Sequence, residues 1–286
     1  MRHVVIFAPA KINLTLDIVG TRPDGYHLLE SIFQTVNVYD VVTVRRRLGR
    51  RITLTAHGCD CPVEKNTAYK AAVAFMAYTG LKRGVHITVN KHIPQQAGMG
   101  GGSADAAGML VALDHLFKTN LTEEQLCEIG LSVGADVPFC IVGGTAYVTG
   151  IGEEVTPLRP LPDCQIVVAQ PAEGISTKEA YAAVDNAVIL ARPDNRSAMT
   201  ALEQGDLQGV CQQAVNVFES ATELAGVADI RRRMEQYSPL CSQMTGSGSC
   251  VFAIFEEDDP NAEGCLDDLC RDYPNTFLCF PCRGII

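Results

Sequence analysis

The sequence predicts an α+β protein built from two domains. Its 286 residues correspond to about two domains at roughly 150 residues each. Strand-like segments come first along the chain, helical segments follow, and a second set of strands and helices comes after a proline-rich stretch. The prolines are Pro157, Pro160 and Pro162, and they mark the clearest change in composition. We therefore expect an N-terminal domain of residues 1–156 and a C-terminal domain of residues 157–286.

The strands are expected where short runs of apolar and β-branched residues recur. In the first half they cover residues 4–7, 13–18, 38–45, 51–56 and 85–90, and in the second half residues 165–169 and 250–255.

The helices are expected where apolar residues recur at helical spacing or where end signals stand. A helix over residues 67–78 ends on Gly80, a second ends near Phe117, and a capping box from Thr122 to Gln125 opens a third. Further helices are expected at residues 178–184, 207–221 and 229–236.

Composition and charge exclude several classes of protein. With 47% hydrophobic and 20% charged residues, the chain is typical of a folded globular protein. No run of 18 apolar residues is present, and Lys11 and Asp17 interrupt the apolar start, so we expect neither a membrane span nor a signal peptide. The net charge of -10 argues against nucleic-acid binding through a broad basic surface. We expect a cytoplasmic protein whose arginine clusters at residues 45–51 and 231–233 are solvated.

The twelve cysteines are scattered along the chain. Cys279 and Cys282 form a Cys-x-x-Cys pair, but one such pair supplies only half of the ligands of a structural zinc site. We expect free thiols in a reducing compartment. A cysteine-based metal or redox module stays open as an alternative.

A glycine-rich segment at residues 94–105 is the most informative part of the sequence. Four glycines stand among residues 98–102, directly before the helix that ends near Phe117. Backbone N–H groups approach an anion closely there, and the helix dipole favours negative charge, so the segment is suited to bind phosphate. The alternative is a flexible linker with Ser103 as an ordinary N-cap, but so many glycines are entropically costly unless a close approach requires them. A Walker A loop would need a lysine after Gly102, and a Rossmann fingerprint would need a glycine in place of Ser103.

The chain resembles the GHMP kinases in three motifs that occur in the family's order. They are APAKINL at residues 8–14, the glycine-rich segment, and MTGSGSCVF at residues 244–252. The resemblance implies a two-domain GHMP kinase fold with the active site in the interdomain cleft, and ATP as co-substrate. Residues 22–31, 100–103 and 134–139 resemble the branch of the superfamily that acts on a cytidine diphosphate-linked methylerythritol. That branch phosphorylates the 2-hydroxyl of this polyol in the non-mevalonate route to isoprenoid precursors.

Asp136 and Lys11 are the expected catalytic residues. Asp136 is flanked by small and apolar residues, in a loop that we expect between a helix and an apolar strand, and poor solvation there suits a carboxylate base. The residues alone leave a simple turn-forming role open. By resemblance, Asp136 accepts the proton of the acceptor hydroxyl, and Lys11 neutralises charge on the transferred phosphoryl group. For Lys11 the alternative is a lysine that extends its ammonium from a strand end into solvent.

The expected substrate-binding residues lie in both halves of the chain. Tyr26 and His27 offer an aromatic face and polar groups to a pyrimidine. By resemblance they recognise cytosine, and Asn13 positions the acceptor end. Thr177 and Tyr181 resemble positions that cover the cytidine, although Thr177 also suits a helix cap.

The expected ATP-binding residues follow from the resemblance as well. They are Asn66, Lys91, Gly98, Met99, Gly100, Gly101, Gly102, Ser103, Gly246 and Ser247. We expect Mg²⁺ with the nucleotide but no dedicated metal site in the protein. Asp105 either assists Mg²⁺ through water or is a first-turn acid that suits the helix dipole. Ala104 departs from the family's usual second serine, so a hydroxyl contact at that position is not expected.

Other functions stay open at this point. One is a different GHMP kinase, acting on homoserine, mevalonate or a sugar, and another is a nucleotide-binding module without catalysis. For partners we expect a small-molecule substrate, no nucleic acid, no membrane, and a monomer or weak homodimer.

Overall fold

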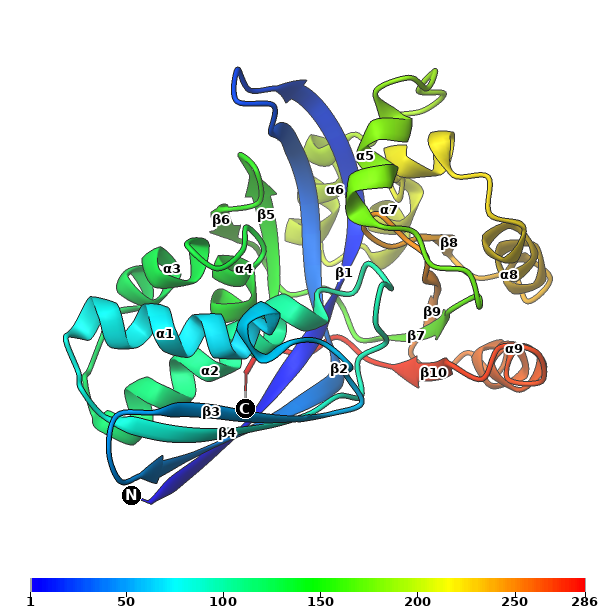
Figure 1. Ribbon diagram of the computed structural model, residues 1–286. Helices are drawn as coiled ribbons and strands as arrows, with labels where there is room; N and C mark the ends of the chain where they lie inside the picture. The colour runs from blue at the N-terminus through cyan, green and yellow to red at the C-terminus, as the bar shows by residue number, and fades with distance from the viewer. Residues whose placement is uncertain (1, 286) are drawn as a thin grey trace.

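A computed structural model describes residues 2–285 of the chain, which form two β-sheets with helices packed against them (Figure 1). The first sheet runs in the order β3-β4-β2-β5-β6, with β1 paired to β2, and the second runs β10-β7-β9-β8. In the first sheet β3 and β4 pair in parallel and the other pairs are antiparallel, and the second sheet is antiparallel throughout. The predicted α+β class is confirmed. The strands of the first sheet are β1 His3–Thr21, β2 His27–Arg47, β3 Ile52–His57, β4 Gly84–Asn90, β5 Thr145–Thr149 and β6 Glu154–Pro157, and those of the second are β7 Cys164–Ala169, β8 Cys241–Met244, β9 Val251–Glu256 and β10 Thr276–Cys279.

The long hairpin of β1 and β2 links the two halves of the molecule. It runs from the end of the molecule where the N-terminus lies to a tip beside α5 (Figure 1). The segments predicted at residues 4–7 and 13–18 belong to the single strand β1, whose register shifts after Pro9. The shift directs the Lys11 backbone N–H to the Met99 carbonyl oxygen at 3.0 Å, outside the ladder. A bulge of this kind redirects side chains, and here it turns β1 toward the glycine-rich segment.

Helices α1 to α4 cover one face of the first sheet (Figure 1). Gly80 ends α1 with a left-handed backbone and the capping box at Thr122 opens α3, both at the predicted positions, and Asn66 caps the start of α1. Small residues let α2 lie close to the sheet, since a Cβ on Gly108 would lie 3.1 Å from the Ala8 Cβ. The bounds are η1 Val63–Lys65, α1 Thr67–Thr79, α2 Gly101–Phe117, α3 Glu123–Leu131 and α4 Val137–Val142.

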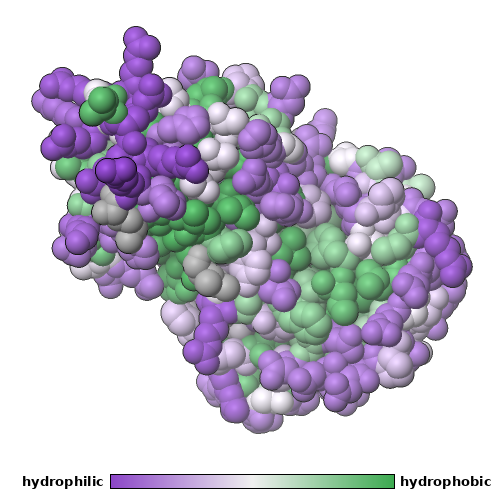
Figure 2. Space-filling model, turned by 90° about the horizontal axis from the view of Figure 1, so that it is seen from below, coloured by the Kyte–Doolittle hydropathy of each residue, from purple (hydrophilic) through white to green (hydrophobic). Residues whose placement is uncertain are grey.

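At the N-terminal end of β1, the opposite face of the first sheet is open to solvent. Val5 and Phe7 point away from α2 and are 43% and 44% exposed, whereas Ile6 between them is buried. Figure 2 shows the molecule from this side, with hydrophobic surface between hydrophilic margins.

The second half packs its helices around the second sheet. The bounds are α5 Thr177–Val184, α6 Asn195–Gln204, α7 Leu207–Gln212, η2 Val217–Ala221, α8 Ala225–Glu235 and α9 Asn261–Leu269. Among residues 2–285, no helix is long and apolar enough to cross a membrane.

The two sheets contact each other, so the two halves of the molecule are not structurally independent. The chain passes from one sheet to the other between Pro157 and Cys164. Near its end it returns to the first sheet, where the Cys282 N–H donates to the Thr35 carbonyl oxygen at 2.9 Å. The boundary between residues 156 and 157 stays a prediction.

Two predicted elements are wrong. Asp136 is followed directly by helix α4 and not by the apolar strand that was expected after its loop, because Pro138 suits the first turn of a helix. The helix predicted over residues 207–221 is two shorter elements, α7 and η2. Between them Asn216 is extended and donates its amide to the carbonyl oxygens of Met244 and Gly246, each at 2.8 Å. The pattern also missed α6, α9, β5, β6, β8 and β10.

Candidate active site

A cleft of about 1230 Å³ lies between the β1–β2 hairpin, the glycine-rich segment and α5. Every residue predicted for the site lines this cleft. The predicted catalytic and substrate-binding residues on its wall are Lys11, Asn13, Tyr26, His27, Asp136, Thr177 and Tyr181. The predicted ATP-binding residues on its wall are Asn66, Lys91, Gly98, Met99, Gly100, Gly101, Gly102, Ser103, Gly246 and Ser247.

The glycine-rich segment begins helix α2 without a side-chain cap. The N-cap is Gly100, in a left-handed conformation, and within residues 2–285 no side chain caps this end. Ser103 lies inside the helix, so the alternative in which it is the N-cap is wrong. A helix leaves its first N–H groups without intrahelical partners, and here they are open to an anion at the edge of the cleft.

Two of the motifs interlock through glycines. A Cβ on Gly98 would lie 1.9 Å from the Thr245 carbonyl oxygen, and one on Gly246 would lie 2.8 Å from the Gly98 carbonyl oxygen. Both glycines have positive φ, at +72° and +56°. The Thr245 hydroxyl in turn accepts from the Asn13 backbone N–H at 3.1 Å. The three motifs thus meet at one point, and only glycine allows the approach.

Lys11 is buried at the base of the cleft with one carboxylate near it. Its side chain donates to Asn13 Oδ1 at 2.7 Å and lies 4.0 Å from Asp136 Oδ2. The ammonium is 4.8 Å from the centre of the Phe33 ring. Burial lowers the pKa of Lys11, and the negative charge of Asp136 opposes that effect. Burial of the ammonium therefore outweighs the stabilisation that these contacts give it.

Asp136 directs its carboxylate to the cleft. It directly precedes α4, yet within the described residues it caps no N–H of that helix. Its side chain is 32% exposed, and the absence of a Cβ on Gly152 leaves room beside Oδ1. This arrangement does not fit a turn former whose carboxylate bonds to its own backbone.

Lys91 is held by two carboxylates. Its ammonium donates to Asp40 Oδ2 and, at 2.7 Å, to Asp105 Oδ2. Asp40 also accepts from the backbone N–H groups of His92 and Ile93, at 2.6 and 2.9 Å. Burial lowers the pKa of Lys91, but the two carboxylates outweigh it and raise the pKa above the ordinary value. Asp105 is the fifth residue of α2, so the alternative of a first-turn acid is wrong, and its carboxylate contacts Lys91. A contact with Mg²⁺ through water stays a prediction.

An aromatic cluster borders the other end of the cleft. The His27 ring stacks on Tyr181 with centroids 4.6 Å apart, and Tyr181 meets the edge of Phe218 at 4.9 Å. His27 Nε2 is 2.7 Å from the Asp185 carboxylate. Tyr26 is 59% exposed at the rim. Burial raises the pKa of Tyr181 to about 12, with a smaller contribution from the charge of Asp136, so this phenol stays protonated at neutral pH.

Thr177 and Asn66 join the cleft in different ways. Ser176, not Thr177, caps α5, so the capping alternative for Thr177 is wrong. Thr177 Oγ1 lies 3.3 Å from Ser247 Oγ, which brings α5 to the third motif. Asn66 Oδ1 accepts from the N–H groups of residues 68 and 69 as the cap of α1. Its acceptor is therefore engaged by the helix, and its amide nitrogen stays on the cleft side.

Several cleft residues carry no signal in the sequence. Asp185, Phe218 and Phe33 line the cleft, and Asp40 holds Lys91 from behind it. Each is a common residue in an ordinary strand or helix segment, and its partner lies far away along the chain. Only the fold reveals them.

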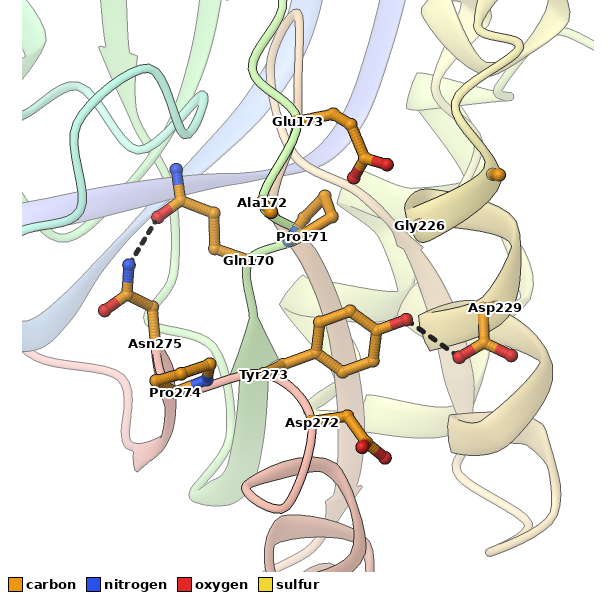
Figure 3. Close-up of a pocket in the computed structure, with 11 residues that line it drawn as sticks. Gln170, Pro171, Ala172, Glu173, Gly226, Asp229, Asp272, Tyr273, Pro274 and Asn275 are labelled. Carbon is orange, nitrogen blue, oxygen red and sulfur yellow. Dashed lines mark hydrogen bonds between the residues drawn. The ribbon is translucent and has the colours of Figure 1, made fainter.

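A smaller cavity of about 450 Å³ lies in the second half of the molecule and contains none of the predicted site residues. Figure 3 shows Tyr273 donating to Asp229 at 2.8 Å, and Asn275 donating to Gln170 at 3.0 Å. Glu173, Asp229 and Asp272 supply carboxylates to this wall, so it would repel a polyphosphate.

Two family matches cover more than half of the chain. Residues 66–144 match the GHMP kinases N terminal domain and residues 198–275 match the GHMP kinases C terminal. Among solved structures, a crystal structure of 4-(cytidine 5'-diphospho)-2C-methyl-D-erythritol kinase superposes with a TM-score of 0.80 at 30% identity, covering 97% of this chain and 99% of that chain. A homoserine kinase from Cytophaga hutchinsonii superposes with a TM-score of 0.79 at 17% identity over 100% and 97% of the two chains, which shows a shared fold.

Curated relatives agree over nearly the full length. The 4-diphosphocytidyl-2-C-methyl-D-erythritol kinase of Clostridium tetani is 41% identical over 96% of this chain and 98% of its own. The enzyme of the same name from Clostridioides difficile is 41% identical over 97% of this chain and 95% of its own. The two-domain GHMP kinase fold is thereby confirmed, and the chain belongs to the 4-diphosphocytidyl-2-C-methyl-D-erythritol kinase family.

Proposed function

We propose that this chain transfers the γ-phosphoryl group of ATP to the 2-hydroxyl of 4-diphosphocytidyl-2-C-methyl-D-erythritol, in the non-mevalonate route to isoprenoid precursors. The observation that carries the proposal is one cleft that holds three features together. An uncapped helix N-terminus adjoins the Lys11–Asp136 pair, and an aromatic cluster borders the cleft.

The nucleotide phosphates bind the glycine-rich segment in this proposal. Backbone N–H groups of residues 100–103 donate to them, and the dipole of the 17-residue helix α2 favours their negative charge. Gly246 and Ser247 support the segment from behind, since Gly246 packs directly on Gly98. Asn66 and Lys91 lie in the adjoining wall and complete the adenosine side.

Asp136 orients and deprotonates the acceptor hydroxyl. Its exposed carboxylate accepts the proton as the oxygen attacks phosphorus. Lys11, 4.0 Å away, offsets the charge that develops on the transferred group. The buried ammonium gains a counter-charge when the phosphates arrive, so substrate binding reverses the cost of burying it.

The cytidine end is recognised by aromatic and polar groups. The Asp185 carboxylate lies 2.7 Å from His27 Nε2 and orients the imidazole ring. The polar ring and the stacked Tyr181 together suit the edge and face of a pyrimidine. Tyr26 stacks on the base from the rim, Tyr181 and Thr177 close the second side, and Asn13 positions the polyol near Lys11.

Mg²⁺ accompanies the nucleotide. Among residues 2–285 no group of three or more His, Cys, Asp or Glu side chains could hold a metal ion. This fits an ion that is bound mainly by phosphate oxygens and water with one or two protein contacts. Ser103 Oγ and the unpartnered Asp105 Oδ1 are the protein atoms proposed for those contacts, the second through water. The ion neutralises charge on the phosphates.

We further propose a cytoplasmic enzyme that is a monomer or weak homodimer and binds neither nucleic acid nor membranes. The net charge of -10 supports the last part of this proposal, because it disfavours contact with nucleic acids and anionic membranes.

A coupled assay of ADP release tests the substrate assignment. The cytidylated polyol is expected to give turnover, and homoserine, mevalonate and galactose are expected to give none. If one of these supports turnover instead, the substrate assignment fails while the family's kinase chemistry stands. ATP binding without ADP release from any acceptor would favour a nucleotide-binding module without catalysis.

A further inference from the structure

Two cysteines line the same cleft and take no part in the proposed phosphoryl transfer. Cys59 and Cys61 lie in the loop between β3 and η1, and both are partly exposed at the cleft wall. Their sulfur atoms are 3.3 Å apart and both are free thiols. A disulfide requires sulfur atoms about 2.05 Å apart, so a small movement of this loop joins them.

This cysteine pair adjoins the residues proposed for the adenosine side. Cys61 Sγ accepts a hydrogen bond from the Asn66 amide at 3.7 Å. Gly58, the residue before the pair, packs on Lys91, where a Cβ would lie 3.2 Å from the lysine Cβ. A change in this loop therefore reaches Asn66 and Lys91 together.

We propose that Cys59 and Cys61 form a reversible disulfide that weakens ATP binding. The effect on ATP rests on the proposed function, whereas formation of the bond does not. The oxidant is a low-molecular-weight disulfide.

The chemistry is thiol–disulfide exchange in two steps. The Cys61 thiolate attacks one sulfur of the small disulfide, forms a mixed disulfide and releases one small thiolate. The Cys59 thiolate then attacks Cys61 Sγ, forms the Cys59–Cys61 bond and releases the second small thiolate. The two cysteine protons pass through solvent to the two small thiolates, so two cysteines are oxidised and one small disulfide is reduced to two thiols.

The hydrogen bonds assign the order of the two steps. Cys61 Sγ accepts from the Cys59 thiol and from Asn66, and donors directed at a sulfur stabilise negative charge there. Burial, then the hydrogen bond to Cys61, raises the pKa of Cys59, which disfavours its thiolate. The nucleotide charge beside the loop further disfavours a thiolate, so bound ATP is expected to slow the oxidation.

The disulfide draws the loop together and moves Cys61 Sγ toward Cys59, which is expected to break its hydrogen bond with the Asn66 amide. The KM for ATP is expected to rise about 2- to 10-fold, the range that one lost hydrogen bond gives. The KM for the polyol is expected to stay unchanged, because the aromatic cluster lies at the other end of the cleft.

Peptide mapping of the full-length protein provides the test. The reduced protein is equilibrated with glutathione at increasing ratios of the oxidised form, with and without ATP, then alkylated and digested with trypsin. Cleavage after Arg51 and Lys65 releases residues 52–65, which contain these two cysteines and no other. As the share of oxidised glutathione rises, the peptide is expected to lose both alkyl groups together, and its mass should be two hydrogen atoms below that of the unalkylated dithiol. With ATP present the same change should require longer oxidation. After reduction and a second alkylation, both groups should return.

Two matched variants connect the bond to ATP binding. Cys61→Ser removes the pair, so its KM for ATP is expected to be the same before and after oxidation. Cys270→Ser replaces an exposed cysteine far from the cleft, so it should respond to oxidation as the unaltered protein does.

Three results would overturn the proposal. In the first, the peptide of residues 52–65 would keep both alkyl groups at every ratio. In the second, it would carry a single glutathione. In the third, the disulfide would form while the KM for ATP stayed unchanged. Failure of the proposed function is distinguishable, since it shows as absent polyol turnover in the fully reduced protein.

Discussion

Lys11 and Lys91 flank the glycine-rich segment from its two sides, and their ammonium groups have different partners. A Cβ on Gly100 would lie 3.0 Å from Lys11 Cγ, and one on Gly101 would lie 3.2 Å from Lys91 Nζ. Lys11 has a single carboxylate at 4.0 Å, whereas Lys91 donates to two buried carboxylates. Their pKa values move in opposite directions, downward by burial for Lys11 and, against burial, upward by the carboxylates for Lys91.

Burial alone therefore does not determine whether the charge of a lysine is balanced within the protein. The charge of Lys91 is neutralised by carboxylates of the protein itself, so its main role is to join Asp40 on β2 to Asp105 on α2. The charge of Lys11 is only partly balanced and is available to a phosphoryl group. We therefore assign the chemistry to the Lys11 side and the support of the loop to the Lys91 side.

The largest effect is expected at Asp136, the one carboxylate of the Lys11 side. Asp136→Asn keeps the shape and removes the base, so kcat should fall by about 10²- to 10⁴-fold. ATP affinity should persist, because the N–H groups of the glycine-rich segment do not depend on this side chain. Single-turnover kinetics with a separate ATP-binding titration checks both points.

The Lys11→Ala variant shows whether the two residues act as a unit. It should fall in the same range, and the double variant should lose much less than the product of the two effects. Near-normal turnover of Asp136→Asn at saturating substrates would return Asp136 to a structural role.

A methyl group on either side of the glycine-rich segment tests the two lysines separately. Gly100→Ala forces a side chain onto a residue at φ +70° and against Lys11, so kcat should fall by about 10²-fold. Gly101 already has a helical backbone in α2, and the methyl group of Gly101→Ala would contact only the side chains of Lys91 and Ile93. We therefore expect kcat to change less than about tenfold. Equal losses in both variants, measured as kcat on folded protein, would contradict the division of roles.

A substitution at the cytidine end leaves both lysines in place. Tyr26→Ala should weaken binding of the cytidylated polyol by about 1–3 kcal/mol through lost stacking, while ATP affinity barely changes. Tyr26 is exposed, so thermal stability should be maintained. Calorimetric titration with each substrate measures the two affinities, and an equal loss of both would indicate a folding defect instead.

The pH dependence gives the smallest effect and addresses Lys11 directly. Because burial lowers the pKa of Lys11, its charge is lost at a lower pH than that of an ordinary lysine, and kcat/KM should decline there as pH rises. In Lys11→Arg the guanidinium stays charged, so the kcat/KM of the variant should no longer decline as pH rises. An unchanged alkaline limb in the arginine variant would assign the titration to another group.

Local patterns were sufficient to predict the parts of the site that depend on backbone chemistry. The glycines before α2, the Gly80 end of α1 and the capping box at Thr122 act within a few residues, and each lies where the sequence placed it. The six apolar residues of α4 fit a buried strand or a buried helix equally well, so the pattern alone did not decide between them.

Contacts between distant residues were beyond the reach of the sequence. Asp185 pairs with His27 across 158 positions, and Asn216 breaks a predicted helix because its amide binds a loop 28 to 30 residues away. The contacts of Lys91 with its two carboxylate partners are also contacts of this long-range kind. Whether a buried lysine is free or neutralised depends on such contacts, which only the fold supplies.

Replacing each lysine by methionine, with turnover measured on folded protein, tests the division of roles most directly. Lys11→Met should lower kcat by about 10²- to 10⁴-fold with little loss of stability. Lys91→Met leaves two buried carboxylates without a counter-charge, so unfolding in urea should show a loss of about 3–5 kcal/mol while the folded fraction keeps most of its turnover. A Lys91→Met protein that is stable but inactive, beside a Lys11→Met protein that still turns over, would contradict the account.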